Sequence, residues 1–297
     1  MSNKMKDRLA TVLLTLIAVI IIAILFGLLG FILKNGAAKL NWHFLTSPPD
    51  LLNPGGGIGP QLFNSFYLLF LTMAIALPIG LGAGIYMAEY APDNKFTQFI
   101  RLSIEVLSSL PSIVVGLFGL LVFVNLTGWG YSIIAGAFAL TVFNLPLLVR
   151  ITEDAIRSVP RDQKEASYAL GVTKWKTITT VILPAAIPGI ITGAILASGR
   201  VFGEAAALLF TAGMSSPDLV YSNFDLNSPT SPLNVFRPAE SLAVHIWKVN
   251  TEGLVPDARA VADGSAAVLV IAVLIFNIGA RWFGRWLYRR MTSASAS

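Results

Sequence analysis

The stretch LATVLLTLIAVIIIAILFGLLGFIL, residues 9–33, contains 25 consecutive residues without a charge. An α-helix rises 1.5 Å per residue, so about 20 apolar residues cross a hydrocarbon core about 30 Å thick. The whole chain of 297 residues has the same character, because 55% of its residues are hydrophobic and 12% are charged. Soluble domains carry about 25% charged residues. The sequence therefore predicts an integral membrane protein.

Five further stretches are apolar and long enough, or nearly so, to cross the membrane. The turn LTGWG, residues 126–130, separates two of them, and Pro78 interrupts another. We expect an all-α membrane protein with a single transmembrane domain over residues 1–297. The six predicted spans are residues 9–33, 62–88, 104–126, 131–149, 184–211 and 262–283.

The distribution of positive charge predicts the topology. The apolar run of residues 9–33 exceeds the 7 to 15 residues of a signal-peptide core, so we expect a retained anchor. Of the 21 Lys and Arg residues, 15 fall in segments assigned to the cytoplasm and 5 in external segments. This bias predicts that both termini are cytoplasmic. Because topology accounts for the net charge of +5, that charge is not an indication of nucleic-acid binding. The sequence contains no cysteine, which excludes disulfides and thiolate sites.

Two external segments are expected. Residues 47–60 are too rich in Pro and Gly to form a helix. Residues 213–260 form a longer external loop, with a short helix predicted around residues 240–249. This loop is interpreted either as a surface for a soluble partner or as a lid on the bundle. His43 and His245 lie in external segments without metal-ligand spacing, so no metal site is predicted.

Between the fourth and fifth spans lies a polar cytoplasmic loop, residues 150–183. Its composition predicts two short helices joined by a sharp corner. Ser158 is expected to cap the first helix, Gly171 to adopt the left-handed conformation that ends it, and Thr173 to cap the second. One face of the second helix is expected to carry Trp175, Ile178 and Ile182.

This loop resembles the coupling loop of ABC importer permeases, whose signature is E-A-A-x3-G-x9-I-x-L-P. The matching residues are Glu165-Ala166-Ser167, Gly171 and Val181-x-Leu183-Pro184, with Ser167 replacing Ala and Val181 replacing Ile. The resemblance implies a type I ABC importer permease fold, in which Glu165, Ala166, Ser167, Gly171, Leu183 and Pro184 couple to an ATPase subunit. The alternative is a membrane-surface helix with incidental small residues.

No phosphate-binding G-x-x-x-x-G-K-[ST] loop occurs in the sequence. The chain is therefore expected to be a transport subunit and not an enzyme. We expect it to bind no cofactor directly, whereas ATP and Mg would be used by the partner ATPase.

The fifth predicted span contains two charged residues, Arg200 and Glu204, four residues apart. Each costs about 2.5 to 3.5 kcal/mol at the bilayer centre, so the pair must face protein or water. An arginine on a transport path suits a tetrahedral oxyanion, because its planar fork donates two hydrogen bonds. The alternative is a structural ion pair, helped by close helix packing at Gly199 and Gly203.

Residues 200–211, RVFGEAAALLFT, resemble the R-x-x-G-E-T-A-P-L-L-F-T segment of the membrane subunits of high-affinity phosphate ABC importers, PstA type. Residues 84–91, 110–119 and 150–154 are similar to the same family. Ala205 and Ala207 replace the Thr and Pro of the pattern, which removes one hydroxyl ligand and one helix kink. The resemblance implies a sister permease (PstC type), an ATPase dimer (PstB type) and an extracytoplasmic phosphate-binding protein (PstS type), in a bacterial inner membrane.

Three further features of the spans have a predicted role. Arg150, at the end of the fourth span, is interpreted as a substrate-pathway contact or a positive-inside anchor. Glu105 is expected to pair with Arg101, and the small-residue run at residues 80–84 to pack helices. Competing functions are a permease for phosphonate, sulfate or molybdate, and an ion-coupled transporter or channel acting alone. A transporter or channel that acts alone needs neither a coupling elbow nor a partner ATPase.

Overall fold

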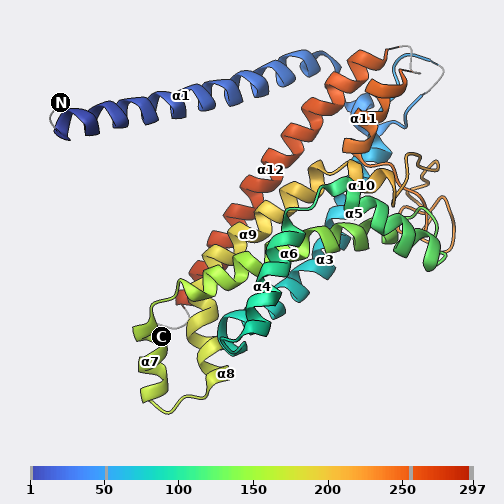
Figure 1. Cartoon of the computed structure of the whole chain (residues 1–297). Coiled ribbons are helices and arrows are strands. Elements are labelled where there is room, and N and C mark those ends of the chain that lie inside the picture. Colours follow the sequence, from blue (N-terminus) through green and yellow to red (C-terminus); the bar gives the residue numbers. More distant parts are fainter. Residues whose placement is uncertain (1–2, 51–52, 254–256, 294–297) are drawn as a thin grey trace.

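The structure, a computed structural model, describes residues 3–50, 53–253 and 257–293, and within these ranges every regular element is helical (Figure 1). The predicted all-α fold is thus confirmed. The long helices are α1 (Asn3–Gly36), α3 (Gly59–Ile85), α6 (Ile133–Arg157), α9 (Leu183–Gly203) and α12 (Ala258–Ser293). The shorter ones are α2 (Trp42–Thr46), α4 (Lys95–Ser108), α5 (Ser112–Gly119), α7 (Arg161–Ala169), α8 (Lys174–Thr177), α10 (Ala206–Leu209) and α11 (Leu242–Glu252).

Five helical segments are long and apolar enough to cross a membrane, and a bent pair of helices could supply a sixth crossing. The five are Lys4–Lys39, Gly59–Tyr90, Ile133–Arg157, Lys174–Gly203 and Ala258–Trp286. The bent pair is α4 with the segment Ser112–Leu126, and the two meet at 99°. The stretch predicted as one span, residues 104–126, is therefore broken. Pro111 ends the helical path, because proline disfavours helical geometry at the preceding residue.

Helices α3, α6, α9 and α12 form the bundle that positions the functional residues (Figure 1). The closest packing joins α3 to α6 at two glycines. A Cβ on Gly80 would lie 2.7 Å from Leu148 Cβ, and one on Gly84 would lie 2.5 Å from Thr152 Cβ. Any larger side chain would push the helices apart. The packing role predicted for residues 80–84 is confirmed at these two positions.

The external loop packs onto the bundle through a buried arginine. Arg237 is 2% exposed and donates to the amide oxygen of Asn64 on α3 over 2.8 Å. Burial lowers the pKa of Arg237 to about 10, against the opposing effect of Tyr67 and Tyr221, and the guanidinium stays charged at neutral pH. Its remaining bonds go to the backbone carbonyls of Ser231, Pro232 and Pro238. This loop is thereby held against α3.

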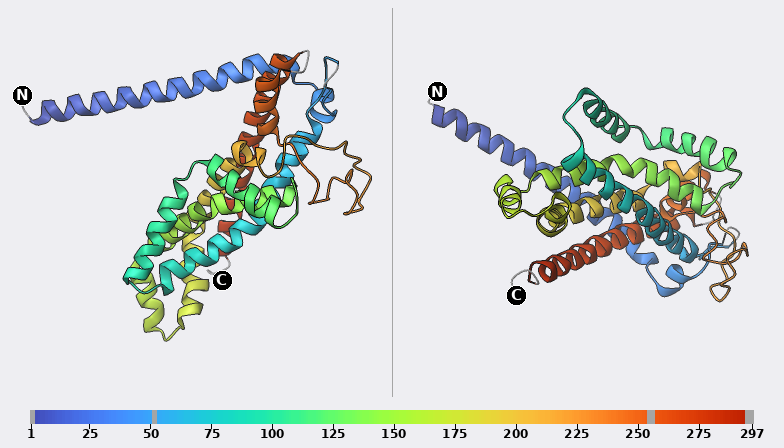
Figure 2. Two further views of the ribbon diagram at one scale, coloured as in Figure 1. Left: turned by 45° about the vertical axis from the view of Figure 1, so that its right-hand side comes forward. Right: turned by 90° about the horizontal axis from the view of Figure 1, so that it is seen from below.

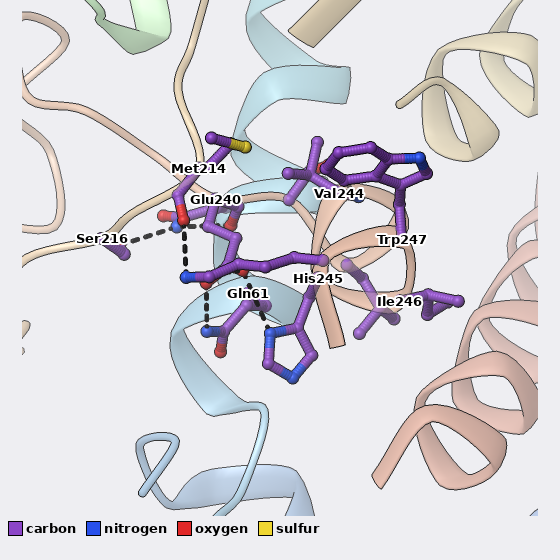
Figure 3. A network of polar contacts seen from close by, with 12 residues as sticks. Gln61, Met214, Ser216, Glu240, Val244, His245, Ile246 and Trp247 are labelled. Carbon is purple, nitrogen blue, oxygen red and sulfur yellow. Dashed lines mark hydrogen bonds and ion pairs between the residues drawn. The ribbon is translucent and has the colours of Figure 1, made fainter. Parts of the chain in front are cut away.

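A second polar network fixes α11 to the start of α3 (Figure 3). Glu240 accepts a hydrogen bond from Gln61 Nε2 over 2.9 Å and one from His245 Nδ1 over 3.2 Å. Burial would raise the pKa of Glu240, but these bonds and the charge of Lys248 outweigh it and lower the pKa. His245 therefore serves the packing of α11. Across the described ranges no group of three or more potential metal ligands occurs.

Helix α1 projects away from the rest of the chain (Figure 2). It contacts α12 where the two helices cross at its C-terminal end. A Cβ on Gly36 would lie 2.4 Å from both Ala267 Cβ and Asp263 O, so glycine permits this crossing. The apolar side chains along most of α1 are about half exposed or more, as at Val12, Ile21 and Phe26. No other element in the described part of the chain packs against this surface.

Candidate functional site

Helices α7 and α8 form an elbow that protrudes from one end of the bundle (Figure 1). The corner between them lies at Gly171, whose φ is +75°. L-residues rarely adopt this left-handed conformation, and glycine adopts it freely. The predicted corner is confirmed. A Cβ at Gly171 would meet no atom within 4 Å, so the backbone conformation alone requires glycine there.

Three predicted details of the elbow were wrong in whole or in part. Ser158 ends α6 and does not cap α7, because Pro160 occupies the capping position. Thr173 does precede α8, but its side chain makes no capping hydrogen bond. Trp175 is 61% exposed, whereas Ile178 and Ile182 are fully buried, so the three do not share an environment. The cause is a π-helical turn over Ile178–Ile182, which changes the angular spacing of side chains.

A buried hydroxyl pair holds the two arms of the elbow together. Ser167 Oγ on α7 and Thr177 Oγ1 on α8 lie 2.8 Å apart, and both residues are buried. Ser167 stands where the family signature has alanine. The hydroxyl group that distinguishes this chain from the signature therefore has a hydrogen-bond partner within the elbow.

The outer surface of the elbow is exposed and partly apolar. Glu165 and Ala166 are exposed on α7. Leu170, beside the corner, is 83% exposed, and Trp175 is 61% exposed. A charged residue beside exposed apolar side chains is suited to contact another protein.

The base of the elbow is set in an apolar cluster that joins α6 and α9. Ile156 near the end of α6 packs with Ile178 and Ile182, all fully buried, and with Ala186 on α9. Leu183 and Pro184 begin α9 directly after this cluster. A displacement of the elbow is thereby passed to α6 and α9, because close-packed cores transmit strain.

Sequence reasoning did not single out Glu89 or its partners. Glu89 lies in the turn Tyr86–Tyr90 that follows α3, and its carboxylate accepts from Lys164 Nζ on α7. Its backbone carbonyl accepts from Lys174 Nζ, which also lies 4.6 Å from the centre of the Tyr90 ring. The sequence did contain an indication of this contact, because Glu89 is the first charged residue after the long uncharged run of the second span.

In the last turn of α9, at the end away from the elbow, Arg200 packs on an aromatic ring of α6. Its guanidinium carbon lies 3.6 Å from the centre of the Phe143 ring, a cation–π arrangement. Within the described residues no hydrogen bond or ion pair occupies its N–H groups. Because the ring covers a face of the planar group, the donors at its edge remain available to a ligand.

The predicted ion pair between Arg200 and Glu204 is wrong. Helix α9 ends at Gly203, so Glu204 leaves the helical face that carries Arg200. Glu204 Oε1 instead accepts from the backbone N–H of Ala207, 3.1 Å away, at the start of α10. Close contact of α10 with α5 fixes this break, because a Cβ on Gly116 would lie 2.9 Å from Ala207 Cα. The close approach suggested at Gly199 and Gly203 is also absent from the described part of the chain, since a Cβ at either would meet none of its atoms within 4 Å.

Arg150 and Glu105 face each other at the end of the bundle that carries the elbow. Arg150 Nη1 lies 3.7 Å from Glu105 Oε1, and both side chains are more than half exposed. The predicted pair of Glu105 with Arg101 is therefore wrong. Arg101 Nε donates to Glu153 on α6 over 3.0 Å, and Arg157 shares the same carboxylate. α4 and α6 are close enough for these contacts because the chain bends between α4 and α5. A cavity of about 260 Å³ lies among these charges.

Comparison with known proteins gives concordant results. The family model described as binding-protein-dependent transport system inner membrane component matches residues 80–293. The chain is 64% identical over 293 residues to the probable ABC transporter permease protein YqgI of Bacillus subtilis (strain 168), covering 99% of this chain and 100% of that one. It is 33% identical over 268 residues to the phosphate transport system permease protein PstA of Xylella fastidiosa (strain Temecula1), covering 88% of each.

A solved structure shares the fold. It is the crystal structure of a bacterial alginate ABC transporter in complex with an alginate pentasaccharide-bound periplasmic protein, and the match has a TM-score of 0.62. The identity is 14% over 97% of this chain and 96% of that chain, so the likeness concerns the fold alone. ABC importer permeases work with a separate ATPase subunit and an external binding protein. The chain belongs to the family of binding-protein-dependent transport system inner membrane components, and it is a multi-pass permease subunit of an ABC importer of the inner membrane.

Proposed function

We propose that this permease carries inorganic phosphate and forms half of the translocation pathway. The observation that carries the proposal is Arg200, whose guanidinium rests on Phe143 with its donors unoccupied by described residues. A planar fork of N–H groups matches two oxygens of a tetrahedral oxyanion. Identity of 33% to a phosphate transport system permease supports phosphate as that oxyanion.

The role proposed for Glu204 is to shape the pathway. Its carboxylate accepts from Ala207 N and holds the break between α9 and α10 open beside Arg200. Interrupted helices are common where membrane transporters bind substrate, since the freed backbone lines a cavity. Arg150 would provide a second, exit-side contact, because its ion pair with Glu105 is long and solvent-exposed.

The elbow is proposed to couple this pathway to an ATPase dimer of the PstB type, which would use ATP and Mg. Glu165, Ala166 and Gly171 present the exposed surface for that subunit. Ser167 holds the two arms of the elbow together, while Leu183 and Pro184 join the elbow to α9. We expect no cofactor bound by this chain itself. We propose that the exposed apolar surface of α1 packs against a sister permease of the PstC type. The external loop is proposed to contact a binding protein of the PstS type.

The test is uptake into proteoliposomes that contain the complete transporter, internal ATP and the external binding protein. Radiolabelled phosphate should accumulate, and an excess of phosphonate, sulfate or molybdate should not compete. Uptake of one of these anions in radiolabelled form, with no phosphate accumulation, would assign the permease to that oxyanion instead. Each measurement is divided by the amount of assembled complex, so that poor assembly is not mistaken for poor transport.

A further inference from the structure

A closed loop, residues 220–230, lies within the external segment that follows α10. Its two ends are joined by a hydrogen bond from Val220 N to Thr230 O, 3.0 Å long. The side-chain amide of Asn223 crosses the loop and donates to Ser228 Oγ over 2.9 Å and to Thr230 Oγ1 over 3.2 Å. These bonds between loop residues define the shape of the segment. Compact loops whose ends meet in this way frequently have a function.

The loop is fastened to the outer end of α3. The ring of Tyr221 packs edge-to-face with that of Phe63, and the ring centres are 5.7 Å apart. Beyond the loop, the hydroxyl of Tyr67 donates to Leu233 O over 2.8 Å, and the buried Arg237 holds the following residues against α3. The loop therefore has a fixed orientation on the bundle as well as a fixed shape.

Apolar side chains of this loop are exposed. Phe224 is 70% exposed and Leu226 is 62% exposed, and the loop lies at the end of the bundle opposite the elbow (Figure 1). A lid over the bundle would bury such side chains against it. Exposed apolar side chains outside the membrane spans are typical of contacts with another protein. Because the loop is already ordered, a partner that binds it loses little affinity to the ordering of the loop.

The segment around the loop is acidic. Between Met214 and Phe236 the only charged residues are Asp218 and Asp225, and both are exposed. Neither carboxylate lies within 4.0 Å of a basic group in the described part of the chain. Like charges repel, so this surface disfavours both phosphate itself and the headgroups of anionic lipids. It is suited to a protein that carries Lys or Arg around an apolar patch.

We propose that this loop docks the extracytoplasmic binding protein, with Phe224 and Leu226 as apolar anchors and with Asp218 and Asp225 attracting a basic rim on that protein. The family model that matches this chain describes binding-protein-dependent transport, so a soluble protein delivers the substrate to the external end of the permease. The inference rests on the proposed function only for the identity of that protein as a phosphate-binding one. Docking is then separate from substrate entry, because the acidic surface repels a released phosphate ion.

The first experiment identifies the occupant of the loop. The photo-reactive substitution Phe224→benzoylphenylalanine is made in the complete transporter in cell membranes, and the cross-linked product is identified by mass spectrometry. Irradiation should join position 224 to an extracytoplasmic binding protein. The same substitution at Leu126, which is 81% exposed in the external turn, is the control and should not give this product. Capture of the sister permease, of a lipid or of nothing at position 224 overturns the proposal.

This experiment also separates the docking site from the proposed function. A captured binding protein that carries a solute other than phosphate would confirm the docking site and refute phosphate as the substrate.

The second experiment measures the affinity of the purified binding protein for the complete transporter in nanodiscs. Phe224→Ser with Leu226→Ser should weaken binding by about tenfold or more, because apolar anchors carry most of the binding free energy of an interface. Assembly with the ATPase and the sister permease should be unchanged, and Leu126→Ser should bind as wild type does. Unchanged affinity in the double serine variant, or loss of assembly in it, overturns the proposal.

The role of the two carboxylates is tested through the association rate. Asp218→Asn with Asp225→Asn should slow association at low salt and remove most of its salt dependence, because opposite charges steer partners together. Asparagine at position 225 keeps the oxygen that accepts from Asn227 N, so the loop retains its shape. An association rate of the wild type that rises with added salt, or one that the double variant leaves unchanged, overturns the basic rim assigned to the partner.

Discussion

The carboxylate of Glu89, after the end of α3, accepts a hydrogen bond from Lys164 on the elbow helix α7. The pair is 75 residues apart in sequence, and the Glu89 side chain is only 8% exposed. It joins the second span of the bundle to the element that is proposed to contact the ATPase. The elbow therefore acts on three long helices, since the apolar cluster at its base already reaches α6 and α9.

Glu89→Gln is expected to lower transport more than ATP hydrolysis. A hydrogen bond between charged groups contributes about 1.5 to 3 kcal/mol, and the amide retains the shape without the charge. The measurement is the ratio of phosphate transported to ATP hydrolysed in proteoliposomes. Glu89→Lys combined with Lys164→Glu should recover part of the ratio. An unchanged ratio in Glu89→Gln would mean that this contact does not carry the coupling.

Gly171→Val should loosen binding of the ATPase subunit. The left-handed corner costs about 1 to 2 kcal/mol for an L-residue, and a β-branched residue is the least tolerant of it. Gly171→Asn is the control, because asparagine adopts this conformation more readily and the site has open space. Co-purification of the ATPase subunit is measured for both. Normal assembly and transport by Gly171→Val would contradict the coupling role.

Ser167→Ala should destabilise the elbow by about 1 to 3 kcal/mol, because it leaves the fully buried hydroxyl of Thr177 without its partner. Replacing both, with Ser167→Ala and Thr177→Val, should be close to neutral. Hydrogen exchange of α7 and α8 reports the change. Additive effects of the two single substitutions would show that the hydroxyls do not interact.

Arg200→Met should abolish phosphate uptake while the complex still assembles. Methionine keeps an unbranched chain over Phe143 but offers no donors to an oxyanion. Arg200→Lys keeps the charge without the planar fork and should also transport poorly. Phe143→Leu is the control, since it removes the cation–π contact and keeps the donors. If Arg200→Met transports as wild type does, Arg200 has a packing role only.

The contact of α11 with α3 should weaken in acid. The pKa of Glu240 in the folded protein lies below its ordinary value of 4.5, so its contribution is fully present above that value. The contribution is lost as pH falls through the lower, folded value. The protection of α11 against hydrogen exchange, corrected for the intrinsic pH dependence of amide exchange, should therefore fall below about pH 4.5. Glu240→Gln should remove that dependence, and an equal loss of protection in the variant would assign it to another group.

The elbow was predictable from the sequence because its determinants are local. Gly171 ends a helix through its own backbone freedom, and the spacing around it matched a known signature. The partners of charged residues were not predictable in the same way. Arg101 meets Glu153, 52 residues away, because the bend between α4 and α5 brings α4 against α6. Glu204 left its predicted partner because α9 ends at Gly203, and the next helix, α10, packs closely on Gly116 of α5.

Among the described residues, helix α1 packs on its own chain only at its C-terminal end, around Gly36. In a bilayer an exposed apolar helix suffers no hydrophobic penalty, because lipid tails solvate it as well as another helix does. A newly inserted subunit can therefore hold this arm in many directions at similar free energy. The arm acquires one direction only when a neighbouring surface packs against it. Its position is then a property of the finished assembly and is not encoded in this chain alone.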